Sequence, residues 1–232
     1  MNDGPLSQTE TRELLARLAH MPKKWLGQNF LIDGNIVRKS LELAEIKPGD
    51  RVLEVGPGLG TLTRTLLGAG VELHAVEADP TMVYHLKQSL LPRWPQAFHL
   101  TEGDAVEKPL ADLVAPADGS FKVVANLPYA ISTPWMDAIC AGPHPEIMVL
   151  MLQREAADRL TAEVGTKHWS AVTAQVSLAF ENRTPNASVP GLAKYPGPCS
   201  PSAANKSGRP PRTSFPKQRT CVRGWRPCPA MD

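Results

Sequence analysis

The stretch Arg51-Val-Leu-Glu-Val-Gly-Pro-Gly-Leu-Gly60 decides the fold of this chain. Residues 51–55 are rich in apolar side chains, which predicts a short buried strand. The three glycines that follow allow a tight turn whose backbone a ligand can approach closely. Residues 59–69 are then predicted to form a helix whose first N–H groups face that ligand. A strand, a glycine turn and a helix in this order are typical of an α/β fold with a ligand site at the turn.

The same alternation continues along the chain on both sides of this stretch. Asp79 followed by Pro80 predicts a helix start, because Asp caps free N–H groups and proline is tolerated at the first helical position. Asp33 predicts another helix start in the same way. Five strands with intervening helices predict an α/β fold with a doubly wound parallel sheet. The expected strands are 51–55, 72–77, 97–101, 121–125 and 147–152, and the expected helices are 9–20, one capped by Asp33, 59–69, 80–90, 131–141, 154–163 and 170–180.

The composition limits the location and the cofactors of the protein. A chain of 232 residues with 42% hydrophobic residues is long enough for one α/β domain with a buried core and an appendage. It contains no run of 18 apolar residues and no secretory signal, so we expect a cytoplasmic protein without membrane contact. The four cysteines match no CxxC pattern. We therefore expect neither a disulfide nor a metal.

Positive charge and proline are concentrated in residues 182–232. This segment holds nine Lys/Arg, one acidic residue and ten prolines, and its net charge is +8. The first 181 residues hold 16 basic and 22 acidic residues, a net charge of −6. Because a segment with almost no apolar periodicity cannot bury enough surface to offset its ordering entropy, we expect a disordered tail. A mildly acidic domain can still bind RNA through a local basic patch, so net charge does not decide the substrate.

The glycine turn and the acidic residues around it predict a nucleoside cofactor. The glycine spacing is GxGxG, whereas the pyrophosphate fingerprint of dinucleotide enzymes is GxGxxG. The negative charge of Glu54, just before the turn, is unfavourable beside an anionic diphosphate. It suits the cationic methionine part of S-adenosylmethionine. Glu77 ends the second strand and can accept hydrogen bonds from both ribose hydroxyls, and Asp104 can accept one from an adenine amino group. A ribose-binding carboxylate also fits NAD, and a tight turn without a ligand is the simplest alternative.

Asn126-Leu127-Pro128-Tyr129 follows the fourth strand and is the most specific motif of the chain. An exocyclic adenine amine is a poor nucleophile because its lone pair is conjugated into the ring. The Asn126 side-chain oxygen and the Leu127 or Pro128 carbonyl can accept both amine hydrogens and free that lone pair. Tyr129 offers a face on which a base can stack, and proline stiffens the turn. The motif predicts methyl transfer to an unstacked adenine; an ordinary strand-ending turn is the alternative.

Together these motifs resemble the ribosomal RNA adenine N6,N6-dimethyltransferases, which modify two adjacent adenosines of small-subunit RNA. The resemblance covers residues 23–181 and includes Gly27-Gln28-Asn29-Phe30-Leu31, Gln153-Arg154-Glu155 and Gly165-Thr166-Lys167-His168-Trp169. It implies the class I S-adenosylmethionine-dependent methyltransferase type of fold, without a metal. It also implies a monomer that acts on ribosomal RNA in the immature small subunit. By resemblance, the cofactor contacts are Asn29, Leu31, Gly56, Glu77, Asp104 and Asn126, and the catalytic residues are Asn126, Leu127, Pro128 and Tyr129.

The resemblance also suggests a division of the chain. Residues 1–22 are an N-terminal helical extension, and residues 23–181 are the methyltransferase domain. The tail 182–232 stands where the family has its last strands and a helical RNA-binding domain, and its composition is typical of translation in a shifted reading frame. Lys23, Lys24 and Arg38 are candidates for contacts with RNA phosphates, with a solvated surface as the alternative.

Three other functions are compatible with parts of this pattern. The related large-subunit RNA methyltransferases that confer antibiotic resistance share the Asn-x-Pro-Tyr motif. A nicotinamide dehydrogenase would use the same glycine turn. A binding-only assembly factor would retain the fold without methyl transfer.

Overall fold

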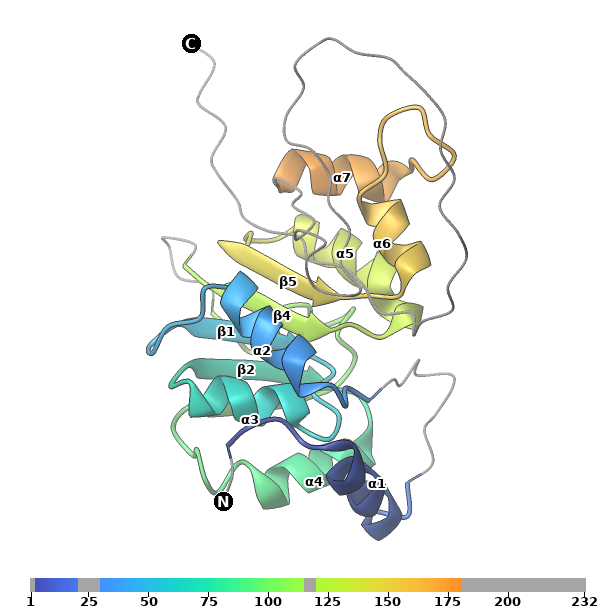
Figure 1. The fold of residues 1–232 in the computed structure, drawn as a ribbon. Helices are drawn as coiled ribbons and strands as arrows, with labels where there is room; N and C mark the ends of the chain where they lie inside the picture. The colour runs from blue at the N-terminus through green and yellow to red at the C-terminus, as the bar shows by residue number, and fades with distance from the viewer. Residues whose placement is uncertain (1–2, 21–29, 115–119, 181–232) are drawn as a thin grey trace.

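The structure is a computed structural model that describes residues 3–20, 30–114 and 120–180 (Figure 1). Lys23, Lys24, Asn29 and the tail 182–232 lie outside the described residues. None of the described helices is long and apolar enough to cross a lipid bilayer.

Five parallel strands form one sheet in the order β3-β2-β1-β4-β5. The order reverses between β1 and β4, which defines a doubly wound sheet and confirms the predicted fold class. β1 and β2 match their predicted bounds, β3 and β4 are shifted by one residue, and β5 ends one residue earlier than predicted. The strands are β1 Arg51–Val55, β2 Glu72–Glu77, β3 Phe98–Glu102, β4 Lys122–Asn126 and β5 Ile147–Met151.

The helices lie where the sequence predicts them and are shorter than predicted, although the first begins one residue earlier, at Gln8. Asp33 and Asp79 cap helices as predicted, accepting hydrogen bonds from the N–H groups of Asn35 (2.8 Å) and Thr81 (3.0 Å). The third helix begins at residue 61 rather than 59, because Gly60 has a φ of +80° and lies outside the helical conformation. The elements are α1 Gln8–Arg17, α2 Gly34–Leu43, α3 Thr61–Gly68, α4 Pro80–Ser89, the 3₁₀ turn η2 Tyr129–Ile131, α5 Ser132–Cys140, α6 Arg154–Leu160 and α7 Ala171–Ala179.

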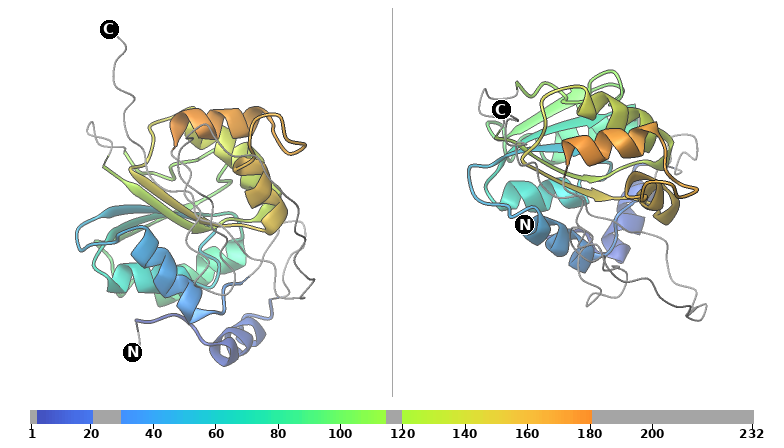
Figure 2. Two further views of the ribbon diagram at one scale, coloured as in Figure 1. Left: turned by 45° about the horizontal axis from the view of Figure 1, so that its top comes forward. Right: turned by 90° about the horizontal axis from the view of Figure 1, so that it is seen from above.

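Helices cover the sheet in two layers, with α2, α3 and α4 on one side and α5, α6 and α7 on the other (Figure 2). Successive side chains of a strand point to opposite faces, so each strand contributes to both layers. In β1, Val52 packs in the core beneath α2 to α4, and Leu53 packs in the core beneath α5 to α7. Trp135 of α5 is completely buried in the second core. The sheet is therefore buried on both faces, as expected for parallel strands.

Helix α1 packs beside the glycine turn. Leu14 is buried against Leu59 and Met82, while Leu15 and Leu18 pack at the margin of the same cluster. Helix α1 thus covers the start of α4 and one side of the turn between β1 and α3.

Candidate active site

The turn between β1 and α3 depends on the conformational freedom of its glycines. Gly56 and Gly58 have φ values of +67° and +56°, a region that side chains with a Cβ rarely adopt. A Cβ at Gly56 would lie 3.4 Å from Pro128, and a Cβ at Gly58 would lie 3.4 Å from Phe30. The glycines therefore let three segments of the chain meet closely around the turn.

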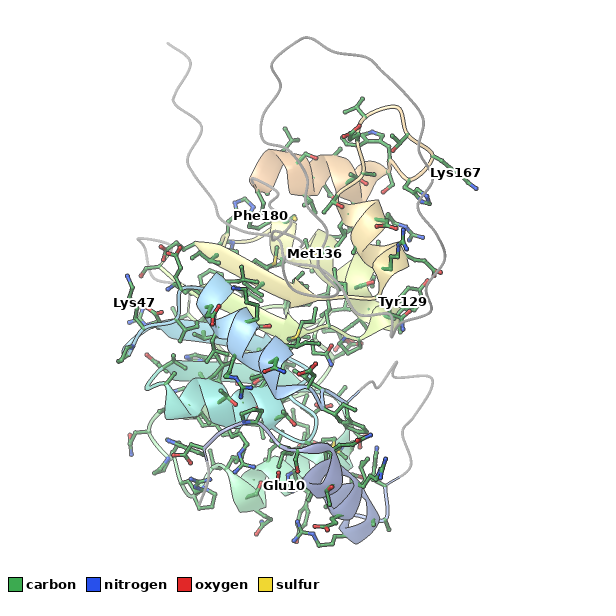
Figure 3. The ribbon with its side chains drawn as sticks, viewed as in Figure 1. Glu10, Lys47, Tyr129, Met136, Lys167 and Phe180 are labelled. Carbon is green, nitrogen blue, oxygen red and sulfur yellow. The ribbon has the colours of Figure 1, made fainter. Side chains whose placement is uncertain are left out.

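A cavity of about 310 Å³ opens at this turn, at the carboxyl ends of the strands. It lies where the strand order reverses between β1 and β4, the usual ligand position in an open parallel sheet. Figure 3 shows Tyr129 and Lys47 at opposite ends of the strands, with Tyr129 at the cavity end. The cavity brings together the predicted residues within the described part of the chain, except for Arg38: Leu31, Gly56, Glu77, Asp104, Asn126, Leu127, Pro128 and Tyr129.

Glu77 connects the cavity to the glycine turn. Its Oε2 accepts a hydrogen bond from the Gly58 N–H, and its Oε1 accepts one from the Asp79 N–H, both at 2.9 Å. Burial raises the pKa of the Glu77 carboxyl, and these backbone hydrogen bonds partly oppose that rise. Each carboxylate oxygen retains a lone pair that can face the cavity. Glu77 thus holds the turn in place and can also accept hydrogen bonds from a ligand.

Asp104 lies at the exposed rim of the same cavity. Its Oδ1 accepts a hydrogen bond from the Val106 N–H at 2.8 Å, which holds the carboxylate in a turn after β3. The preceding Gly103 has a φ of +152°, and its N–H donates to the Glu77 carbonyl at 3.0 Å. The ends of β2 and β3 are therefore joined, and both carboxylates are positioned on one cavity.

Asn126 is the last residue of β4, and the motif then leaves the sheet in a tight turn. The buried Leu127 donates its N–H to the Met151 carbonyl at 3.1 Å, which ties the motif to the end of β5. The Pro128 carbonyl accepts the Ile131 N–H at 3.2 Å. Because that carbonyl already has a partner, the Leu127 carbonyl is the better candidate for a ligand amine. Tyr129 is 46% exposed at the rim, where its ring can meet a base.

Glu54 is a buried acid in the wall of the cavity. Its Oε2 and the Thr63 hydroxyl are buried, and neither has a hydrogen-bond partner among the described residues. Burial raises the pKa of the Glu54 carboxyl to about 8; the nearby Thr63 hydroxyl opposes that rise without reaching hydrogen-bond geometry, and the Glu77 charge adds to it. An unpartnered buried carboxyl oxygen favours a ligand that brings a cation or a donor.

We expect Glu54→Gln to stabilise the folded domain increasingly as pH rises. Below pH 4.5 the Glu54 carboxyl is protonated in both states, and from there to about 8 the unfolded chain releases a proton that the folded chain keeps. The wild type therefore loses stability across this window, and the glutamine variant does not. Urea unfolding at about pH 5 and about pH 8 measures the difference. Glu102→Gln, at the exposed end of β3, is the matched control, and a Glu54→Gln effect that is equal at both pH values would contradict the assignment.

Arg38 is not part of the cavity. It lies exposed on α2, where its guanidinium donates to the Asn35 side-chain oxygen at 2.7 Å. Three further residues line the cavity without having been predicted from the sequence: Met151, Leu152 and Ile131. The first two lie at the carboxyl end of β5, so their position after the fifth predicted strand could have identified them.

The fold and the cavity define the class I methyltransferase type of α/β protein, as predicted. A family model described as "Ribosomal RNA adenine dimethylase" matches residues 19–198. The chain belongs to this family, and the predicted resemblance is confirmed. Membership in the family sets aside the nicotinamide dehydrogenase interpretation.

Relatives and solved structures agree with this family. The chain is 61% identical over 177 residues to the ribosomal RNA small subunit methyltransferase A of Opitutus terrae, covering 76% of this chain and 64% of the relative. It is 38% identical over 192 residues to the protein of that name from Natranaerobius thermophilus, covering 75% and 63%. The chain thus spans slightly less than two thirds of the length of these relatives.

Two solved structures resemble the described fold. The first is a dimethyladenosine transferase from Plasmodium falciparum, with a TM-score of 0.57 and 31% identity over 67% of this chain and 55% of that one. The second is the 23S rRNA methyltransferase ErmE, with a TM-score of 0.54 and 29% identity over 67% and 60%.

Proposed function

We propose that this protein is an S-adenosylmethionine-dependent methyltransferase that dimethylates adenosine N6 in small-subunit ribosomal RNA during ribosome assembly. The observation that carries the proposal is one cavity that joins the glycine turn and its acidic residues to the Asn126–Tyr129 motif. The names of the two relatives above support small-subunit RNA as the substrate. We further propose that it acts as a monomer in the cytoplasm, on immature small subunits.

The residues of the cavity fit S-adenosylmethionine. The unpartnered Glu54 oxygen suits the cationic methionine end, and the glycine turn leaves room for close approach of the cofactor. Glu77 and Asp104 both line the cavity. Glu77 is proposed to accept hydrogen bonds from the ribose hydroxyls, and Asp104 at the rim is proposed to accept one from the adenine amino group. Leu31 is buried at the cavity wall and adds apolar contact. Asn29 remains a predicted contact on the basis of the family motif.

When bound, the cofactor supplies an electrophilic methyl group on a sulfonium. The Asn126 side-chain oxygen and the Leu127 carbonyl accept the two hydrogens of the target amine, which frees its lone pair for attack. These two acceptors would hold the amine nitrogen facing the methyl group that the cofactor would supply. The nitrogen then loses a proton to water. Tyr129 holds the unstacked base by its ring face, so the chain contributes mainly positioning.

Lys23, Lys24 and Arg38 are proposed to contact RNA phosphates. Arg38 supports this role because it is exposed on α2, where a phosphate can replace its hydrogen bond to Asn35. Phosphate contacts strengthen binding to any RNA sequence and weaken as salt rises.

Two alternative functions are each supported by one observation. The similarity to ErmE supports a large-subunit RNA methyltransferase as an alternative. A binding-only assembly factor is supported by the proline-rich composition of residues 182–232, which stand where the family has its last strands and a helical RNA-binding domain.

The decisive experiment measures methyl incorporation by the full chain from labelled S-adenosylmethionine. Immature small subunits, naked small-subunit RNA and large-subunit RNA are offered in parallel, and dimethyladenosine is identified after nuclease digestion. We expect incorporation into small-subunit RNA, with two methyl groups on each target adenosine. Transfer to large-subunit RNA alone would favour the ErmE-like alternative. Binding to immature subunits without any incorporation would favour the assembly factor.

A further inference from the structure

Three potential metal ligands lie together on the sheet, outside the cavity. Glu72 and His74 are two residues apart in β2, so their side chains share one face. His99 of β3 is the register partner of His74 and lies on the same face. Glu72 begins the strand that Glu77 ends, so the group lies roughly 16 Å from the cavity end of the sheet. It is therefore separate from the proposed methyl-transfer site.

The distances in this group match those of a metal centre. Glu72 Oε1 is 3.3 Å from His74 Nε2 and 3.6 Å from His99 Nε2. One ligand atom from each residue lies within 4.8 Å of the others. The imidazole rings are stacked, with centroids 4.5 Å apart and an angle of 23°. In a tetrahedral zinc site with bonds of about 2.0–2.1 Å, ligand atoms lie about 3.3–3.4 Å apart, so an ion requires only small side-chain movements.

The surroundings keep the ligands in position and in their metal-binding forms. Arg51 Nε lies 3.4 Å from the second carboxylate oxygen of Glu72 and orients the first toward the histidines. Burial lowers the pKa of His74, which favours the neutral imidazole that binds a metal. Burial opposes ionisation of Glu72, but the hydrogen bond with His74 and the nearby positive groups lower the pKa of its carboxyl overall. His99 is 42% exposed at its side chain and gives an ion access from solvent.

We propose that Glu72, His74 and His99 form a binding site for a divalent transition metal of the Zn²⁺ type. Two imidazoles and one carboxylate are a ligand set that zinc accepts, with water in the fourth position. The ion would connect β3, an edge of the described sheet, to β2. His74 Nδ1 has no hydrogen-bond partner among the described residues, so the support that usually strengthens a metal-bound histidine is missing. The site therefore binds more weakly than closed four-ligand structural sites.

The test uses the untagged full chain, so that no added histidines bind metal. Calorimetric titration with Zn²⁺ is expected to show one equivalent bound, and Co²⁺ is expected to give visible absorption bands of a nitrogen- and oxygen-ligated site. His99→Gln should weaken Zn²⁺ binding at least about tenfold, since even the loss of an outer-shell partner costs about 10–100-fold. His168→Gln removes an exposed histidine outside the group and should leave the affinity unchanged.

Three outcomes would overturn the proposal. The first is the absence of Zn²⁺ binding to the wild type, and the second is equal binding to wild type and His99→Gln. The third is a cobalt spectrum with intense thiolate bands, which would place the ion on the cysteines instead. Zn²⁺ should also raise the melting temperature of the wild type and of His168→Gln, but not that of His99→Gln. Because His99 is partly exposed, the variant is expected to fold.

Discussion

Replacing Asn126 with alanine is expected to lower the rate of methyl transfer about 10²–10³-fold, the cost of removing one preorganised hydrogen-bonding group from a reacting centre. Asn126 ends β4 inside the cavity, next to the Leu127 carbonyl. In the proposed mechanism its side-chain oxygen accepts one hydrogen of the target amine, and alanine offers no acceptor in that position. The amine lone pair then remains conjugated with the ring and attacks poorly.

Cofactor affinity of Asn126→Ala should change much less than turnover. The contacts proposed for the cofactor come mainly from Glu77, Asp104 and the glycine turn, and the variant keeps them all. Single-turnover transfer and equilibrium binding of S-adenosylmethionine separate the two effects. Gln88→Ala removes a carboxamide from the exposed side of α4 and serves as the matched control. If Asn126→Ala transferred methyl groups at the wild-type rate, its assigned role would be refuted.

The second large effect is expected for Glu77→Ala, which should weaken S-adenosylmethionine binding about 100-fold or more. Two charge-assisted hydrogen bonds to ribose are worth about 1.5–3 kcal/mol each. The variant also leaves the N–H groups of Gly58 and Asp79 without their carboxylate acceptor. Unsatisfied buried donors cost about 1–3 kcal/mol each, so the free energy of unfolding should fall by about 2–6 kcal/mol.

Two measurements distinguish these consequences of Glu77→Ala. Urea unfolding without cofactor reports the loss of the two backbone hydrogen bonds, and calorimetric titration under folding conditions reports the loss of cofactor contacts. Glu102→Ala is the matched control, because Glu102 is the register partner of Glu77 but has an exposed side chain. A Glu77→Ala variant with wild-type affinity would show that the ribose lies elsewhere.

Much of the fold could be predicted because local patterns and burial agree. Residues 51–55 and 72–77 are strands with the predicted bounds, since both are short apolar segments next to turns. Asp33 and Asp79 were predicted as caps because a side-chain acceptor must satisfy the first N–H groups of a helix. The start of the third helix was less predictable. The positive φ of Gly60 delays its start, and a glycine in the sequence does not reveal which sign its φ takes.

Most of the residues that line the cavity could also be predicted from the sequence. Parallel strands end at one edge of the sheet, so residues after the first four predicted strands could be assigned to one site. The contribution from the end of β5 was missed, because Met151 and Leu152 carry no polar group that indicates chemistry. The second role of Glu77, holding the glycine turn, also required the positions of the Gly58 and Asp79 N–H groups.

The sequence by itself determined the alternation of strands and helices, the glycine turn and the Asn126–Tyr129 motif, since each depends on residues close together in the chain. Only the tertiary structure decided that Glu54 is buried without a partner for its Oε2 among the described residues, and that His99 lies against His74 and Glu72. Both depend on which strands become neighbours and in what register. That outcome is set by packing between segments far apart in the chain, where a local pattern carries no information.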